Sequence, residues 1–173
     1  MQRVILGATG MSVSPIALGT MTFGDQVDPD TSYALLDLAV DRGINFLDTA
    51  NSYNAGLTEQ IIGEWLKAHG GRQQLVIASK LRYRVGDDPD SAGLSPKTIL
   101  QQLENSLKRL DTDYLDICFL HQPDDDTPIE TTWRCLDALV ASGRVRCLGL
   151  SNFAAWQIVE IIRVTTDEGT VGY

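Results

Sequence analysis

Short apolar segments alternate with longer amphipathic segments along most of this sequence, and this alternation restricts the possible folds more than any other feature. Apolar runs typical of buried strands occupy residues 16–18, 44–47, 75–78, 114–120 and 145–150. Between them, apolar residues recur every three or four positions, as on the buried side of a helix. Neighbouring parallel strands need a crossover connection, so the alternation predicts an α/β fold with a parallel sheet.

Cap and turn residues indicate where the predicted helices begin and end. Asp28 and Ser95 each precede a proline, a combination that favours a helix start. Residues 127–130 have the spacing of a capping box, which favours a third start. Glycine, which commonly ends a helix, follows three of the helical segments, at Gly43, Gly70 and Gly143.

Two architectures accommodate this alternation, a closed (β/α)8 barrel and an open doubly wound sheet. Residues 7–10 (GATG) follow a predicted strand and resemble the dinucleotide-binding turn of the open sheet, but that turn needs a helix directly after it. Residues 11–15 (MSVSP) are strand-like and contain a proline instead. We therefore expect a barrel, as one domain over residues 1–173. It would hold about the first five β/α units, end in a helix near residues 154–164 and be closed at its bottom by a hairpin over residues 3–13.

Composition and charge argue against several classes of function. The formal net charge is −9 and no basic patch is present, so nucleic-acid binding is not expected. No apolar run approaches the roughly 18 residues of a membrane span, and no signal-peptide core follows the first residue, so nothing argues for export. Three cysteines lie in apolar stretches without metal-ligand spacing. They predict no metal site but buried free thiols of a reducing compartment, and hence a cytoplasmic protein; they are Cys118, Cys135 and Cys147.

Four side chains with acid–base chemistry come at or just after the ends of predicted strands. Asp48 directly follows the predicted strand at 44–47, Lys80 comes two residues after the one at 75–78, His121 directly follows the one at 114–120, and Tyr53 lies in the loop after Asp48. In a barrel the active site forms where the strands end, so these groups should meet at one rim. Each residue alone has an ordinary structural explanation, such as a helix cap or a solvated amine. Their coincidence at corresponding strand ends favours a catalytic site.

Three motifs in the same order resemble those of the aldo-keto reductase superfamily. They are NFLDTANSY at residues 45–53, followed by Thr58, Glu59 and Gly63; LHQPD at residues 120–124; and GRVRCLGLSNF at residues 143–153. The resemblance extends from about residue 6 to about residue 162, and is greatest to the bacterial branch related to potassium-channel β-subunits. One departure lies at residues 54–56 (NAG), where relatives usually place glycine directly after the tyrosine. Asparagine tolerates a left-handed backbone, so we expect the loop to be kept.

The resemblance implies a reaction, the NADPH-dependent reduction of aldehydes and ketones to alcohols. Tyr53 would be the general acid, with Lys80 beside it, Asp48 paired with Lys80, and His121 orienting the carbonyl of a small-molecule substrate. A free phenol has a pKa of about 10. An ammonium group within about 4–6 Å favours the phenolate and can lower such a pKa by roughly 1–3 units. The preference for NADPH over NADH follows from the resemblance alone.

The resemblance also implies which residues contact the cofactor and the substrate. The cofactor set would be Gly19, Thr20, Met21, Asp48, Ser151 and Asn152, the last two at the nicotinamide amide or at the start of the fifth helix. The substrate pocket would include Phe23, Tyr53 and His121, whereas Trp133 has the helical spacing of a core residue.

A complete barrel of this type has about 250 residues, so three further units are expected outside this sequence. They would carry most contacts to the adenine and ribose, supplied by a missing C-terminal segment or an oligomeric partner. The alternative is a truncated chain, weakly active or inactive, that senses cofactor as the channel β-subunits do.

Overall fold

Five parallel strands lie side by side in the order in which they occur along the chain. The computed structural model describes residues 1–88 and 91–167. Its main sheet consists of β3 (Leu18–Gly19), β4 (Phe46–Asp48), β5 (Val76–Leu81), β6 (Leu115–Leu120) and β7 (Val145–Leu150). A doubly wound sheet reverses its strand order at a switch point. No reversal occurs among these five strands, so the sheet has the topology of a barrel rather than of an open doubly wound fold.

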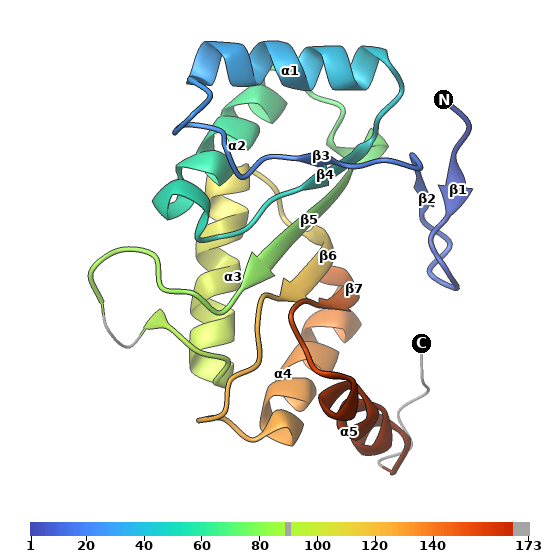
Figure 1. Cartoon of the computed structure of the whole chain (residues 1–173), viewed down its shortest axis with the longest axis vertical. Helices are drawn as coiled ribbons and strands as arrows, with labels where there is room; N and C mark the ends of the chain where they lie inside the picture. The colour runs from blue at the N-terminus through green and yellow to red at the C-terminus, as the bar shows by residue number, and fades with distance from the viewer. Residues whose placement is uncertain (89–90, 168–173) are drawn as a thin grey trace.

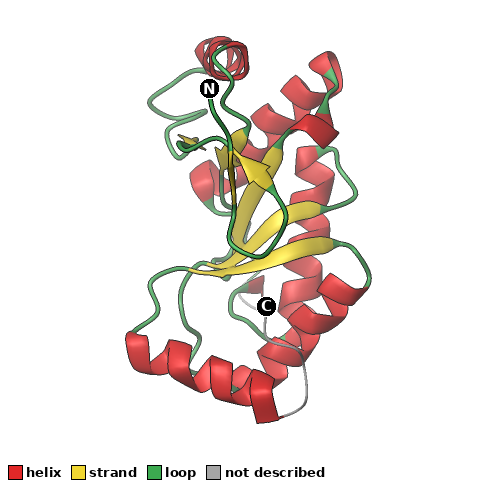
Figure 2. Ribbon diagram, turned by 90° about the vertical axis from the view of Figure 1, so that its right-hand side faces the viewer, coloured by secondary structure: helices red, strands yellow, loops and turns green. Residues whose placement is uncertain are grey.

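A helix follows each strand of the main sheet. The helices are α1 (Pro29–Asp41), α2 (Leu57–His69), α3 (Pro96–Leu110), α4 (Ile129–Ala141) and α5 (Ala155–Asp167). Short 3-10 helices η1 (Tyr53–Gly56) and η2 (Arg72–Gln74) flank α2. Figure 1 shows α1 to α4 following one another down the molecule in chain order, and Figure 2 shows the strands between them and the hairpin. The five predicted strand–helix units are confirmed.

The predicted helix signals are confirmed at two of the three starts. The Asp28 carboxylate accepts a hydrogen bond from Thr31 N and the Ser95 hydroxyl accepts one from Thr98 N, each with a proline at the first turn. The predicted capping box before α4 is wrong. The Thr127 hydroxyl donates instead to Asp124, and the residue at the start of α4 makes no side-chain cap. This hydrogen bond between Thr127 and Asp124 therefore stabilises the loop before α4. The glycines after α1, α2 and α4 have positive φ, as expected.

The strands extend past their apolar runs into polar residues. The run predicted at 44–47 ends in β4 at Asp48, and the run predicted at 75–78 continues in β5 to Leu81. Backbone pairing explains this, because a polar side chain does not interrupt the ladder; Thr49 N donates to Ala78 O beyond the end of β4. Lys80 and Asp48 are consequently held by the sheet rather than by a loop.

The two sides of the sheet pack against different partners. Alternate residues point to opposite sides of a strand. One set, including Leu47, Ile77 and Cys118, belongs to the larger core with the helices. The other set forms a second cluster that we call the inner face: Phe46, Val76, Ala78, Ile117, Phe119 and Cys147. Asp48 and Lys80 have the same parity as this inner face, so they lie above it toward the carboxyl ends of the strands.

The N-terminal hairpin covers the inner face at the amino ends of the strands. Strands β1 (Val4–Ile5) and β2 (Ser12–Val13) pair antiparallel, as predicted. Val13 packs in the same cluster as the inner face, while the side chain of Asn45, just before β4, accepts from Ser14 N and donates to Ser12 O. The hairpin therefore occupies the position expected of a barrel bottom.

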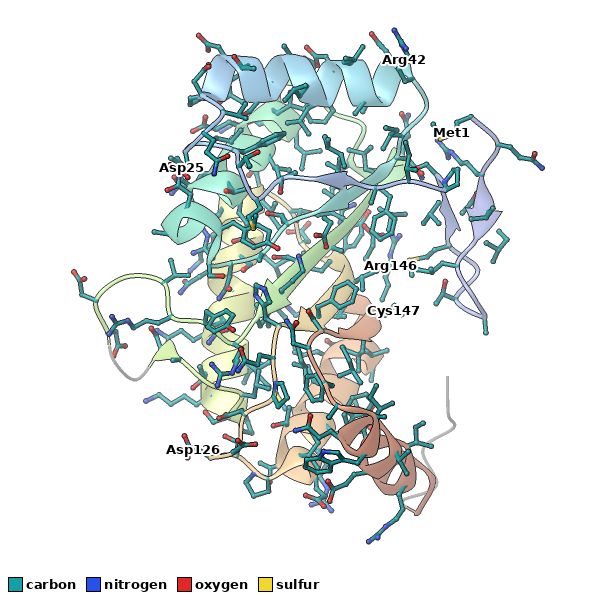
Figure 3. The ribbon with its side chains drawn as sticks, in the orientation of Figure 1. Met1, Asp25, Arg42, Asp126, Arg146 and Cys147 are labelled. Atoms are coloured by element: carbon teal, nitrogen blue, oxygen red, sulfur yellow. The ribbon has the colours of Figure 1, made fainter. Side chains whose placement is uncertain are left out.

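Loops at the two ends of the strands lie on opposite sides of the molecule. In Figure 3, Asp25 and Asp126, which follow β3 and β6, lie on the left, whereas Arg42 and Arg146, near the amino ends of β4 and β7, lie on the right. The left side is therefore where a barrel enzyme has its active site. None of the helices among residues 1–88 and 91–167 is long and apolar enough to cross a lipid bilayer.

Candidate active site

Lys80 is the centre of the candidate active site. Its ammonium nitrogen donates to Asp48 Oδ2 at 2.8 Å, to Tyr53 Oη at 2.9 Å and to the carbonyl oxygen of Thr49 at 2.9 Å. These three acceptors match the three N–H donors of an ammonium group. The residue is only 8% exposed, so its charge is held in place by the pairing with Asp48. The structure thus brings three of the four expected catalytic side chains into direct contact.

Strand register explains why Asp48 and Lys80 meet. Asp48 lies opposite Ala78 in the β4–β5 ladder, two residues before Lys80, on the same side of the sheet. Side chains two positions apart along neighbouring strands are within reach when one of them is long. The lysine therefore spans from β5 to the end of β4, and its amine arrives beside the loop that carries Tyr53.

Tyr53 is placed by an unusual turn. The next two residues, Asn54 and Ala55, both have left-handed backbone, with φ of 46° and 53°. The expectation that Asn54 would tolerate this conformation is met, and Ala55 adopts it as well. Gly56 completes the turn at φ 92°, with the Arg109 side chain packed against it. A turn this tight returns the chain at once to α2, so the Tyr53 phenol remains over the sheet.

His121 lies beside the tyrosine rather than in contact with the lysine. Its ring is 5.9 Å from the Tyr53 ring between centroids, at an interplanar angle of 81°. Burial lowers the pKa of His121, the Lys80 and Arg82 charges lower it further, and Asp48 opposes them, so the imidazole is neutral at pH 7. His121 Nδ1 is buried and has no hydrogen-bond partner within the described part of the chain.

The expected cofactor residues lie at the strand ends on either side of this group. Gly19 pairs with Asp48 across β3 and β4 and is exposed, with open space where a Cβ would stand. Thr20 is buried, and its hydroxyl donates to the Asp48 carbonyl at 2.9 Å, so it supports Asp48. Met21 is 64% exposed.

The other two expected cofactor residues follow β7. Asn152 has φ of 60°, and its amide nitrogen donates to His121 O at 2.8 Å and to Ser151 Oγ at 3.0 Å. Ser151 N donates to Leu120 O, which continues the sheet ladder by one residue. The three residues His121, Ser151 and Asn152 thus form one polar rim.

Two aromatic residues are placed differently from each other. Phe23 was expected at the substrate pocket, but its side chain is 1% exposed and packs in the core between the sheet and the helices. Burial of its apolar ring is favourable, and its carbonyl accepts from the buried Thr58 hydroxyl, which ties the first loop to α2. The interpretation of Phe23 as a pocket residue is therefore corrected to a core residue. Trp133 packs against the same core, as predicted.

A buried ion pair supports the site from behind, and sequence reasoning did not identify it. Glu59 of α2 is fully buried; its carboxylate accepts from Ser79 Oγ at 2.5 Å and pairs with Arg109 of α3 at 2.7 Å. Ser79 precedes Lys80, and Arg109 contacts Gly56. The signal available in the sequence was a glutamate on the apolar side of α2, which needs a buried partner.

Tyr83 is a second residue that sequence reasoning missed. Its ring lies 4.9 Å from the His121 ring at an interplanar angle of 71°, and its phenol donates to Gln122 Oε1. His121 therefore contacts two tyrosine rings. Nothing in the sequence pattern marked Tyr83, because it lies two residues past the end of β5 in an irregular loop.

Known proteins resemble this chain in sequence and in fold. A profile of the Aldo/keto reductase family matches residues 15–171. The chain is a member of the aldo/keto reductase family. A solved structure, the holo form of an aldo-keto reductase from Bacillus halodurans, superposes with a TM-score of 0.83 at 33% identity, over 94% of this chain and 54% of that one. The five β/α units are accordingly part of a (β/α)8 barrel.

Three relatives show the range of the similarity. An uncharacterized oxidoreductase of Bacillus subtilis is 43% identical over 169 residues, 92% of this chain and 52% of that protein. A probable voltage-gated potassium channel subunit beta of Oryza sativa is 38% identical over 99% of this chain and 53% of its own length. A norsolorinic acid reductase of Emericella nidulans is 37% identical over 91% and 44%. The chain spans about half the length of these relatives.

Proposed function

We propose that this chain carries the catalytic part of an NADPH-dependent reductase that converts aldehydes and ketones into alcohols. The observation that carries the proposal is the position of Lys80 Nζ, within 2.9 Å of both Tyr53 Oη and the Asp48 carboxylate. In this arrangement Tyr53 donates its phenolic proton to the alkoxide oxygen formed from the carbonyl. The Lys80 ammonium stabilises the phenolate left behind, because opposite charges at this distance attract strongly in a partly buried site.

Asp48 orients Lys80. Its carboxylate accepts a hydrogen bond from Lys80 Nζ at 2.8 Å and pairs with it as an ion pair. Thr20 in turn holds the Asp48 backbone through its hydroxyl. We propose that Asp48 and Thr20 position the proton donor without themselves exchanging a proton with the substrate.

His121 would orient the carbonyl. Because burial lowers the pKa of His121, the ring is neutral and one nitrogen carries a proton. Nδ1 is buried without a partner in the described structure, and an unpaired buried N–H costs more than an unpaired lone pair. The tautomer protonated at Nε2 is therefore favoured, and Nε2–H is the donor available to a carbonyl oxygen beside Tyr53.

The residues present fit the nicotinamide end of NADPH. Ser151 and Asn152 offer a hydroxyl and a carboxamide at the rim next to His121, the donor and acceptor types that an amide requires. Gly19 leaves open space at the neighbouring strand end. When bound, the reduced nicotinamide supplies the hydride.

The test is NADPH oxidation, followed at 340 nm, with 4-nitrobenzaldehyde as substrate and protein expressed from its complete reading frame. Tyr53→Phe keeps the ring and removes the proton, and is expected to lower kcat by about 10²–10⁴-fold, the usual contribution of a general acid. Tyr33→Phe, on α1, is the matched control and should leave kcat unchanged. Equal rates for wild type and Tyr53→Phe would refute the assignment of Tyr53.

A second candidate is a cofactor-binding module without useful turnover. It is favoured by the 38% identity to a probable potassium channel subunit beta over 99% of this chain. Such a module would quench NADPH fluorescence on binding while showing no oxidation of NADPH in the presence of aldehyde. The same preparation thus distinguishes the two candidates.

A further inference from the structure

Within the described residues, His121 lacks the hydrogen bond that usually orients a functional histidine. Such a ring is normally held by a bond from its second nitrogen to a carbonyl or carboxylate. Here Nδ1 is buried and unpartnered within the described residues. Ring packing takes over that role, because the His121 ring makes T-shaped contacts with the Tyr53 ring at 5.9 Å and the Tyr83 ring at 4.9 Å between centroids. The orientation of His121 therefore depends on what holds Tyr83.

Tyr83 follows a residue with a backbone conformation that side chains rarely adopt. Arg82 has φ of 134°, outside the regions favoured for residues other than glycine. Strain of this kind persists only where the surroundings impose it. The Arg82 carbonyl accepts from Gly93 N at 2.8 Å and its guanidinium Nε donates to Pro123 O at 2.8 Å. The remaining backbone group, Arg82 N–H, needs a partner from elsewhere.

Gln102 of α3 supplies that partner. Its Oε1 accepts from Arg82 N at 2.7 Å and from Asn51 Nδ2 at 3.3 Å, while its Nε2 donates to Ser91 O at 2.7 Å. The side chain is 5% exposed, so these bonds form away from water. Asn51 Nδ2 also donates to the Tyr83 carbonyl at 3.0 Å. One amide thus joins the loop after β5 to the loop that leads from Asp48 to Tyr53.

We propose that Gln102 is a positioning residue for this site: by clamping Arg82 and Asn51 it holds the Tyr83 ring against His121. The inference rests on the proposed function, since it assigns a role in orienting the histidine of that site. Gln102 touches neither His121 nor Tyr53, so its effect passes through Tyr83. Without the hydrogen bonds from Arg82 N and Asn51 Nδ2 to Gln102, the backbone at Arg82 and Tyr83 relaxes. His121 then loses its ring contact with Tyr83.

The first test observes His121 directly and needs neither cofactor nor turnover. The sequence contains two histidines, so the imidazole region of a ¹⁵N–¹H spectrum holds two sets of resonances. His69, the last residue of α2, stacks on Trp65 with ring centroids 4.8 Å apart and is the internal reference. Gln102→Met, which keeps the length and removes the amide, is expected to shift the His121 resonances and leave those of His69 in place. Gln101→Met, on the exposed side of the same helix, should move neither.

Two further variants separate positioning from general destabilisation. Gln102→Glu keeps an acceptor oxygen for Arg82 N and Asn51 Nδ2 but loses the donor to Ser91 O, so its His121 resonances should stay closer to wild type than those of Gln102→Met. Tyr83→Leu should reproduce the shift seen in Gln102→Met although Gln102 is intact, and combining the two should add nothing. If Gln102→Met does not fold, Tyr83→Leu and Gln102→Glu still decide the matter. Unshifted His121 resonances in Tyr83→Leu would overturn the proposal.

Kinetics provide the second readout and distinguish the two proposals. With 4-nitrobenzaldehyde, Gln102→Met should lower kcat roughly 10-fold with a smaller change in KM, since misplacing a catalytic group by about 1 Å costs up to about 10²-fold. If wild type does not oxidise NADPH but His121 shifts as expected, the positioning role stands and the proposed activity fails. If wild type turns over and Gln102→Met matches it in both kcat and spectrum, the positioning role fails alone.

Discussion

Removing the Glu59 carboxylate is expected to destabilise the fold by an amount that the structure allows us to estimate. Glu59 is fully buried and receives hydrogen bonds from Ser79 Oγ at 2.5 Å and from Arg109 Nε at 2.8 Å, besides the ion pair at 2.7 Å. Glu59→Gln removes the charge and keeps the size of the side chain. The Arg109 guanidinium is then left buried beside a neutral amide that also presents N–H donors to it.

The magnitude follows from the burial of the two partners. Breaking a buried pair by removing one partner costs about 3–5 kcal/mol. The Arg109 side chain is 15% exposed, so water can still reach part of the guanidinium and the lower end applies, about 3 kcal/mol. That is a large share of the roughly 5–15 kcal/mol that stabilises a typical domain. The loss should also loosen the turn at Gly56, since Arg109 packs against it.

Urea unfolding followed by tryptophan fluorescence measures this loss. The buried Trp65 on α2 is a local probe, and an unchanged m value would show that stability alone has changed. Glu64→Gln, on the exposed side of the same helix, is the control and should change the free energy of unfolding by less than about 0.5 kcal/mol. Arg109→Met should cost less in the Glu59→Gln background than in wild type. A loss below about 1 kcal/mol for Glu59→Gln would contradict a stabilising buried ion pair between Glu59 and Arg109.

Three other expectations concern the proton donor, the packing of α2 and the response to pH. Lys80→Met should lower kcat for NADPH-dependent reduction on the order of 10²-fold, because Tyr53 loses the ammonium at 2.9 Å; a loss under about threefold would contradict the role given to Lys80. Gly63→Ala would place a Cβ 2.1 Å from the Arg109 carbonyl oxygen, so urea unfolding should show a loss of about 1–3 kcal/mol or more. The pKa of His121 is lowered in the fold, so protonation favours the unfolded chain and stability is lost as pH falls below about 6.5. His121→Asn should flatten that part of the stability–pH curve, and an identical curve would argue against a lowered pKa of His121 in the folded chain.

The order of elements was available from the sequence because it depends on local chemistry. The signals are the apolar runs, the helical spacing and the cap residues Asp28 and Ser95. Each of these signals involves residues that are close in sequence, so it can be identified without the tertiary structure. The capping box predicted before α4 was wrong because a local pattern does not determine which of several nearby groups a hydroxyl bonds. The Thr127 hydroxyl donates to Asp124 instead of capping the helix.

Asp48, Tyr53, Lys80 and His121 could be named from the sequence because each lies at or near a strand end, and parallel strands bring their ends to one rim. Which atoms touch was decided by tertiary structure. Strand register places Lys80 two residues beyond Ala78, which pairs with Asp48. The left-handed backbone at Asn54 and Ala55 keeps the Tyr53 phenol beside the Lys80 amine. His121 was expected in the same cluster, and the structure places it beside Tyr53, against a second tyrosine.

The residues that support the site were settled only by the tertiary structure. Glu59, Gln102 and Tyr83 lie 21, 22 and 3 positions from Lys80 in the sequence. Glu59 falls within a family motif and on the apolar side of a helix, but nothing local indicates the partners of these three residues. Phe23 was expected to line the substrate pocket, but the structure buries it in the core. The physical reason is common to all four residues. Local sequence determines which element a residue belongs to, whereas burial and hydrogen bonds between separate elements determine which groups its side chain contacts.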